Sequence, residues 1–314
     1  MTKEHGGTGK HVPVLLEEAI EGLQIKPGGI YIDGTFGRGG HSRAILQRLG
    51  VEGRLLAIDR DPQAIEEADQ DLLRNPAFEL IRGEIGELGN IAAEKEWQGR
   101  IDGLLLDLGV SSPQLDQPER GFSFQQDGPL DMRMDPDSGQ SAAEWLAEVS
   151  EQELRRVLRQ YGEEKAAGRI ARAIVAARAD KAIETTGQLA SVIESVLPRR
   201  GQRRHPATKA FQGIRIFTND ELGQIERGLA ASLDLLAKGG RLAVISFHSL
   251  EDRAVKRFMR HASIEPEPYR GLPEIPEEHR PPLRLVGKAQ AANDDEAIRN
   301  PRSRSARLRV AERI

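Results

Sequence analysis

One segment of the sequence, residues 29–41, restricts the possible fold more than any other. An apolar run over residues 30–32 ends in Asp33, four glycines follow within seven positions, and a helical pattern begins near Ser42. Glycine allows positive φ and lets a ligand approach the backbone closely, and the free N–H groups of a helix start favour an anion or carboxylate. The segment therefore predicts a strand, a tight loop and a helix start that together bind a nucleotide cofactor.

The same strand and helix alternation continues along the chain. Strands are expected at residues 30–32, 54–58, 78–81 and 101–106, with helices at 42–49, from Asp61-Pro62 onward, and at 85–97. Strands and helices that alternate at this spacing indicate a parallel sheet with right-handed crossovers. The sequence predicts an α/β protein with a mostly parallel, doubly wound sheet.

Three of these strands end in an acid, namely Asp33, Asp59 and Asp107. In such sheets the ligand lies at the carboxyl ends of the strands, at the switch point. A single aspartate there is usually a helix cap, but three beside a glycine loop indicate a binding site.

The alternation stops after Asp107 and resumes with a helix over residues 219–236, capped by Asn219 and stopped by Gly239-Gly240, and a strand at 242–247. We expect a cofactor domain of residues 1–111 and 213–314 and a mainly helical substrate-recognition insertion of residues 112–212. The capping boxes expected in the second half of the insertion are Ser141 with Glu144, Ser150 with Glu153, and Thr185 with Gln188. Further elements are expected as a helix capped by Ser249 and Asp252, a short strand at 283–286 and an edge strand at 306–311.

Composition narrows the class of protein. The chain has 314 residues, a net charge of −4 and no cysteine. The lack of cysteine excludes disulfides and thiolate zinc sites and fits a reducing compartment. The first ten residues lack the apolar core of a signal peptide and no run could span a bilayer, so we expect a cytoplasmic protein without a membrane partner. The seven histidines show no paired spacing with carboxylates, and no metal site is predicted.

Basic residues gather in two short stretches of this mildly acidic chain. The first holds Arg199, Arg200, Arg203, Arg204, His205 and Lys209, and the second holds Arg299, Arg302, Arg304, Arg307 and Arg309. Such local patches fit a phosphate-bearing partner, and ordinary solvated surface charge is the alternative.

The loop itself separates two cofactor classes. Asp59 lies 20 positions after Gly39, as a dinucleotide dehydrogenase would require, but Ser42 stands where the third glycine is expected. Instead Asp33 directly precedes the loop. This order matches the acid-x-Gly-x-Gly-x-Gly pattern of class I S-adenosylmethionine (SAM) methyltransferases, with Thr35 in place of the first glycine.

Longer motifs then resemble one family. They are DGTFGRGGH (33–41), DLGVSSPQLD (107–116), RGFSF (120–124), GPLDMRM (128–134) and SFHSLEDR (246–253), and they resemble the bacterial 16S rRNA cytosine-N4 methyltransferases (RsmH/MraW). The resemblance implies SAM as cofactor and a cytidine in the decoding centre of 16S rRNA, within the small ribosomal subunit, as methyl acceptor. The SAM contacts expected from the loop pattern and the resemblance are Asp33, Gly37, Gly39, Gly40, His41, Asp59, Ile85, Asp107 and Gln114. Ile85 stands where the family has a phenylalanine near the adenine, so an aliphatic wall replaces a stacking ring.

Asp107 and His248 are the candidate catalytic residues. Asp107 could accept a hydrogen bond from the cytosine amine. His248 could contact the base or a phosphate, or it could bond the next helix start. The aromatic residues considered for holding the base are Phe122, Phe124, Trp145 and Phe247. A dehydrogenase and a non-catalytic ribosome-assembly protein remain the alternative functions, and the oligomeric state is open, with a homodimer as one alternative.

Overall fold

The structure is a computed structural model that describes residues 13–197 and 205–314. Its contacts divide the described chain into two compact units. The first unit comprises the described residues up to Asp59, Gln63–Leu108 and Ile225–Ile314, and the second comprises Arg60–Pro62 and the described part of Gly109–Gln224. The expected insertion of residues 112–212 falls within the second unit.

A seven-stranded sheet forms the centre of the first unit, as predicted for an α/β fold. Its strands are β1 (Ile30–Asp33), β2 (Arg54–Asp59), β3 (Phe78–Arg82), β4 (Ile101–Asp107), β5 (Leu236–Ser246), β6 (Leu283–Ala291) and β7 (Arg307–Arg313). Their spatial order is β3-β2-β1-β4-β5-β7-β6. The first five strands pair in parallel, and β7 pairs antiparallel with both β5 and β6. The order reverses direction between β1 and β4, which places the switch point beside the glycine loop.

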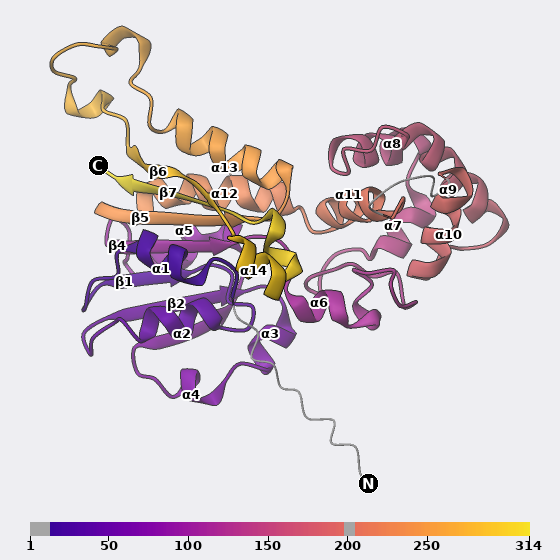
Figure 1. Cartoon of the computed structure of the whole chain (residues 1–314), viewed down its shortest axis with the longest axis horizontal. Helices are drawn as coiled ribbons and strands as arrows, with labels where there is room; N and C mark the ends of the chain where they lie inside the picture. Colours follow the sequence, from indigo (N-terminus) through magenta and orange to yellow (C-terminus); the bar gives the residue numbers. More distant parts are fainter. Residues whose placement is uncertain (1–12, 198–204) are drawn as a thin grey trace. The chain divides into compact units, whose positions relative to one another are not determined.

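Helices cover both faces of this sheet, and Figure 1 shows α1 and α2 in front of the strands. The helices of this part of the chain are α1 (Leu16–Leu23), α2 (Gly40–Leu46), α3 (Pro62–Glu66), α4 (Gln70–Leu73), α5 (Leu88–Glu94), α12 (Glu221–Leu235), α13 (Ser249–His261) and α14 (Asp294–Arg299). Strand β2 is apolar from Leu55 to Ile58 and β4 from Leu104 to Leu106, because both faces of the sheet are covered there. Their side chains at Leu56 and Leu104 are fully buried.

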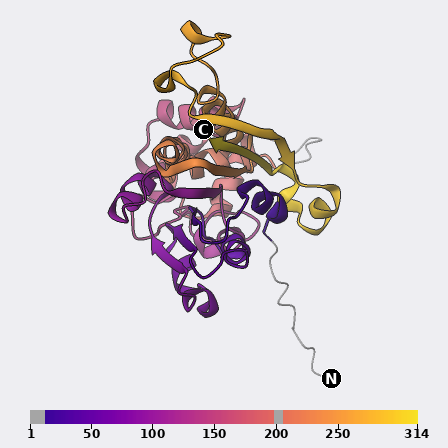
Figure 2. The same ribbon diagram turned by 90° about the vertical axis from the view of Figure 1, so that its left-hand side faces the viewer.

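The carboxyl-terminal part closes one edge of the sheet. Figure 2 shows β6 and β7 as long antiparallel arrows, with β6 at the edge. Strand β6 runs to Ala291, beyond the expected residues 283–286, and a register shift between Val286 and Gln290 interrupts its pairing with β7. Such a bulge bends an edge strand and makes it a poor template for further pairing.

The second unit is helical and has its own core. Its elements are α6 (Ser112–Asp116), η2 (Pro118–Arg120), α7 (Ala142–Glu148), α8 (Glu151–Gln160), α9 (Ala167–Asp180), α10 (Thr186–Val196) and α11 (Thr208–Thr218). Leu154, Ile170 and Ile214 lie in one cluster and are fully buried. The capping boxes predicted at Ser141 and Thr185 are present, and Ser150 caps α8 by accepting a hydrogen bond from the Glu153 N–H. Pro198, expected to end the last helix, lies outside the described residues.

Two sequence predictions about the ends of α11 and α12 were wrong. Asn219 is the C-cap of α11 rather than the start of the next helix, because its side chain has other partners. Helix α12 ends at Leu235, and β5 begins at once and runs through Gly239 and Gly240. Pairing of Leu236 with Ile101 on β4 extends the strand where glycine would otherwise end the helix.

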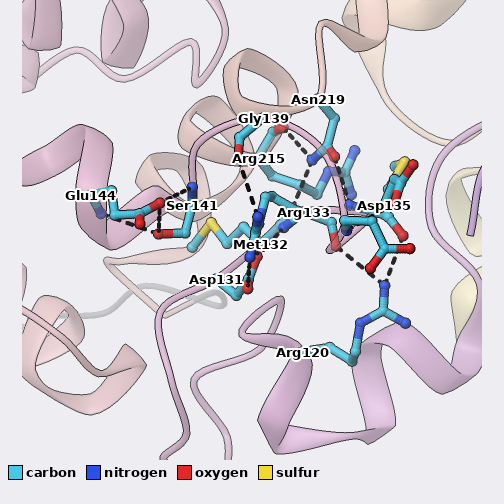
Figure 3. Close-up of polar contacts among 12 residues, drawn as sticks. Arg120, Asp131, Met132, Arg133, Asp135, Gly139, Ser141, Glu144, Arg215 and Asn219 are labelled. Atoms are coloured by element: carbon cyan, nitrogen blue, oxygen red, sulfur yellow. Dashed lines mark hydrogen bonds and ion pairs between the residues drawn. The ribbon is translucent and has the colours of Figure 1, made fainter.

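Asn219 instead holds a strained segment of the second unit, as Figure 3 shows. Met132 has φ +63°, although its side chain is bulky and fully buried. The Asn219 amide donates to Met132 O at 2.7 Å and accepts from Met134 N–H at 2.7 Å. Arg120 donates to Met134 O at 2.9 Å, and its own carbonyl accepts from Met132 N–H at 3.1 Å. These bonds over-determine a backbone conformation that bulky residues rarely adopt.

Replacing Asn219 by alanine should release this segment. Two buried backbone groups would lose their partners, which costs about 2 kcal/mol or more. We expect the Met134 amide of Asn219→Ala to exchange its hydrogen much faster than in the parent chain. The exposed substitution Gln152→Ala in the same unit should leave that exchange unchanged, and equal protection in Asn219→Ala would contradict the assigned role.

Candidate functional site

The glycine loop folds back between the ends of β1 and β2. Phe36 N–H donates to Ile58 O at 2.9 Å, and Gly37 N–H donates to Asp59 Oδ2 at 2.7 Å. Gly39 has φ +70°, and a Cβ there would lie 2.7 Å from the Phe36 ring. A Cβ on Gly40 would lie 2.1 Å from Pro13. These two positions therefore require glycine, and Gly37 also favours it, because its φ is +54° although a Cβ there would meet no close contact.

Asp33 holds this loop together from inside. Its side chain is fully buried, Ser42 Oγ donates to Oδ2 at 2.7 Å, and Thr35 N–H donates to Oδ1 at 3.2 Å. Burial raises the pKa of Asp33, and the bonds from Ser42 and Thr35 act against that rise. Ser42, which the sequence analysis treated only as a missing glycine, is thus a partner of the strand-end acid. A contact of Asp33 with the cofactor's methionine end stays a prediction.

Asp107 stands at the end of β4, next to β1. Its backbone N–H donates to Thr35 Oγ1 at 2.6 Å, and its Oδ2 lies 3.6 Å from His41 Nδ1. Its Oδ1 is buried and accepts no hydrogen bond from the described residues. Burial raises the pKa of Asp107 well above its usual range, and the nearby carboxylates of Asp33 and Glu251 raise it further.

The structure thus brings the three strand-end acids and the loop together in the first unit. Ile85 begins the short helix η1 (Ile85–Glu87) after β3, and its Cγ2 would lie 3.4 Å from a Cβ on Gly34. It therefore lines the same loop, as a residue near the adenine would need to.

His248 serves as a helix cap. It is the N-cap of α13, its Nδ1 accepts from Glu251 N–H at 3.4 Å, and its Nε2 lies 3.1 Å from Glu251 Oε1. The predicted caps Ser249 and Asp252 lie inside the helix instead, because His248 and Glu251 form the capping box. Glu251 is fully buried and was missed in the sequence; its position three residues after the N-cap was the available signal. A substrate contact of His248 stays a prediction.

Gln114 belongs to the second unit, where both ends of its side chain are engaged. Its Oε1 accepts from Ser111 N–H at 2.9 Å, and its Nε2 donates to Asp61 Oδ2 at 2.8 Å. Arg120 Nη1 also donates to Asp61 Oδ2 at 2.8 Å, and the Asp61 side chain is almost completely buried. Gln114 therefore fixes the segment that follows Asp59 along the chain, and a direct contact with SAM stays a prediction.

The four aromatic residues considered for holding the base lie in different surroundings. Phe122 is buried beneath the Arg120 guanidinium, so its ring is covered. Phe124 packs against His205 and Phe211 with ring centroids 4.5 and 4.7 Å away. The Trp145 ring lies 4.6 Å from Phe217, and Phe247 packs partly buried against the core of the first unit. These three remain candidates to stack on a base.

The basic stretches are only partly described. Arg199, Arg200, Arg203 and Arg204 lie outside the described residues, His205 Nε2 lies 2.7 Å from Glu194, and Lys209 donates to Glu163 O. In the second stretch Arg309 forms a bidentate pair with Asp252, with Nε 2.8 Å from Oδ1. The side chains of Arg299, Arg302, Arg304 and Arg307 are exposed.

The chemistry of this donor and acceptor set fits SAM better than a dinucleotide. The strand ends hold three acids; Asp33 is buried and already hydrogen-bonded, whereas Asp59 and Asp107 would repel a pyrophosphate. They favour a ligand that carries positive charge and hydrogen-bond donors, such as a sulfonium, an ammonium and ribose hydroxyls. The buried Oδ1 of Asp107 is an acceptor that such a donor could satisfy.

The chain is similar to several solved structures. An rRNA methylase from Streptococcus thermophilus has 14% identity and a TM-score of 0.39, with 95% of each chain covered. A protein from Streptococcus mutans in complex with SAH has 13% identity and a TM-score of 0.41, with 97% of this chain and 100% of that chain covered. A SAM-dependent O-methyltransferase from Thermotoga maritima has 10% identity and a TM-score of 0.41, with 98% and 68% covered.

A sequence-family comparison is more specific. The model described as the MraW methylase family matches residues 8–314. Among the described residues, no helix is both long and apolar enough to cross a bilayer. The match, the sheet order and the acidic strand ends agree, and the chain belongs to the MraW methylase family, a family of methyltransferases with a class I fold whose cofactor is SAM.

Proposed function

We propose that this methyltransferase transfers a methyl group from SAM to the exocyclic N4 amine of a cytidine in the decoding centre of 16S rRNA. The observation that carries the proposal is Oδ1 of Asp107, which stands at the end of β4 beside the switch point of the sheet and accepts no hydrogen bond within residues 13–197 and 205–314. The motif resemblance and the exposed arginines of the second basic stretch support this choice of substrate. A chain without cysteine is consistent with work on ribosomal RNA in the reducing cytoplasm.

The residues of the loop and strand ends would hold the cofactor. In this arrangement Asp59 accepts from the ribose hydroxyls, Ile85 borders the adenine, and Gly37, Gly39 and Gly40 border the methionine end. When bound, SAM supplies a methyl group already activated by a sulfonium. The protein's task is therefore to align the acceptor, and such positioning is worth roughly 7–11 kcal/mol.

The amine itself is a poor nucleophile because its lone pair is delocalised into the cytosine ring. Asp107 can counter this by accepting a hydrogen bond from N4–H and then the proton that the methylated amine must lose. Because its pKa is raised, the carboxylate is a better proton acceptor than an ordinary aspartate.

The direct test uses labelled SAM and small ribosomal subunits that lack the modification. We expect label in a single cytidine of the 16S rRNA. Asp107→Ala should lose methyl transfer by a factor of about 10² to 10⁴ while RNA binding persists. Near-normal turnover in this variant would remove Asp107 from the chemistry. No label with the parent enzyme, although SAM still binds, would favour the assembly-protein alternative.

The basic residues generate a prediction about salt. If the exposed Arg304 and Arg307 contact phosphates, the affinity for RNA falls steeply as the salt concentration rises. In a plot of the logarithm of the binding constant against the logarithm of the salt concentration, removing each contact makes the slope shallower by about 0.7. The double variant Arg304→Ala/Arg307→Ala should therefore bind RNA with a flatter salt dependence. The exposed Arg74 on the loop after α4 is the control. An unchanged slope in the double variant would exclude this stretch from the RNA interface.

Asp107, whose Oδ1 is buried although 24% of its side chain is exposed, should also lower the stability of the fold. With its pKa raised, Asp107 in the folded protein keeps a proton that the unfolded chain has already lost, so its contribution becomes destabilising as pH rises above about 4. Asp107→Asn should raise the free energy of unfolding at pH 7, on the order of 1 kcal/mol. Urea titrations should show this gain shrinking as the pH approaches about 4.

Asp102 provides the matched control because it lies on the same strand but has partners. Its Oδ1 lies 2.9 Å from Lys26 Nζ, and its Oδ2 accepts from Ile30 N–H. Asp102→Asn should be neutral or destabilising at pH 7. Loss of stability in Asp107→Asn at pH 7 would show that the carboxylate is stabilised by the fold after all.

A further inference from the structure

The contact between His41 and Asp107 has no part in the function proposed above. His41 stands in the first turn of α2, directly after the glycine loop, and only 6% of its side chain is exposed. Its Nδ1 lies 3.6 Å from Asp107 Oδ2, a distance suited to an ion pair. The resemblance implied that His41 contacts SAM, and nothing in that role requires it to face the acid.

The surroundings of Asp107 are otherwise acidic. Asp33 on β1 and Glu251 on α13 both act electrostatically on Asp107. His248, the second histidine of this region, is 3.1 Å from Glu251. Among these titratable groups, His41 is the one whose ring lies within ion-pair distance of the Asp107 carboxylate. When its ring is protonated, it is the cation placed to oppose the repulsion from the other two acids.

The two oxygens of Asp107 differ in their contacts. Oδ2 faces His41 Nδ1, whereas Oδ1 is buried and accepts no hydrogen bond from the described residues. The backbone N–H of Asp107 is also fixed, because it donates to Thr35 Oγ1 at 2.6 Å. Oδ2 thus faces a protein group, whereas Oδ1 has no hydrogen-bond donor among the described residues.

We infer that His41 is a positioning residue for the methyl transfer, which holds Asp107 through Oδ2 so that Oδ1 accepts the hydrogen bond and then the proton of the cytosine N4 amine. This inference rests on the proposed function. The step balances in atoms and charge: the bond between the methyl group and the sulfonium breaks, N4 gains the methyl group and gives up one proton, and Oδ1 takes that proton. The carboxylic acid then returns it to water after product leaves, so no further reactant is needed.

The first test needs neither RNA nor turnover. NMR titration of the histidine rings in the free protein should show that Asp107→Asn lowers the pKa of His41, since the ring loses an anionic neighbour. Assignment comes from the signal lost in His41→Asn. His261, on the exposed side of α13, is the control whose titration should not move. An unchanged His41 titration in Asp107→Asn would overturn the pair.

The second test separates positioning from cofactor contact. At saturating SAM and RNA, His41→Ala should lower kcat by about tenfold or more, since small misplacements of a catalytic group have effects of this size. It should also shift the acidic limb of the pH–rate profile to higher pH, because the pKa of Asp107 rises without the ring. His41→Asn, whose side-chain amide can donate to Oδ2 from a similar place, should recover most of kcat.

The outcomes are distinguishable. Reduced SAM affinity by calorimetry, with kcat and the pH profile unchanged in both His41 variants, would show that His41 only contacts the cofactor and would overturn the inference. If the parent enzyme methylates no cytidine, the proposed function fails. The NMR titration still decides in that case whether His41 and Asp107 form a pair.

Discussion

The buried carboxylate of Asp33 is the constraint on which the rest of the site depends. A buried carboxyl group at the end of β1 needs hydrogen-bond partners inside the fold, and Ser42 and Thr35 supply them. Those bonds tie the end of a strand to the start of a helix across a loop that only glycine can follow at Gly39. The loop is consequently fixed before any ligand arrives, and its backbone N–H groups at Gly34 and Phe36 donate to carbonyls at the ends of β4 and β2.

Fixing the loop in this way gathers negative charge. The site presents three acids at the strand ends, with Glu251 close behind Asp107. Such a cluster opposes the stability of the fold and is retained where it serves a ligand of complementary charge. The same sheet order supports many chemistries, so it is this acidity, rather than the fold, that separates a SAM site from a dinucleotide site.

Much of the first unit could be predicted because its signals are local. Apolar runs, strand-end acids and glycine spacing lie within single segments, and the predicted strands at β1 to β4 agree with the structure. The wrong predictions concern residues whose role depends on a partner that is not evident from the local sequence. The local sequence predicts that Asn219 caps the following helix, but its side-chain amide is hydrogen-bonded to the backbone of Met132 and Met134, more than eighty residues away. His248 caps α13, although histidine is an unusual cap and Ser249 is the more ordinary choice. The facing of His41 and Asp107 likewise depends on the pairing of β1 with β4.

The central claim is that the acidic strand ends select a cationic methyl donor over a dinucleotide. Isothermal titration calorimetry of the full chain with SAM, and separately with NAD, tests it most directly. The account predicts saturable binding of SAM, weakened in Asp59→Asn, and no measurable heat with NAD. Binding of NAD with no binding of SAM would contradict it.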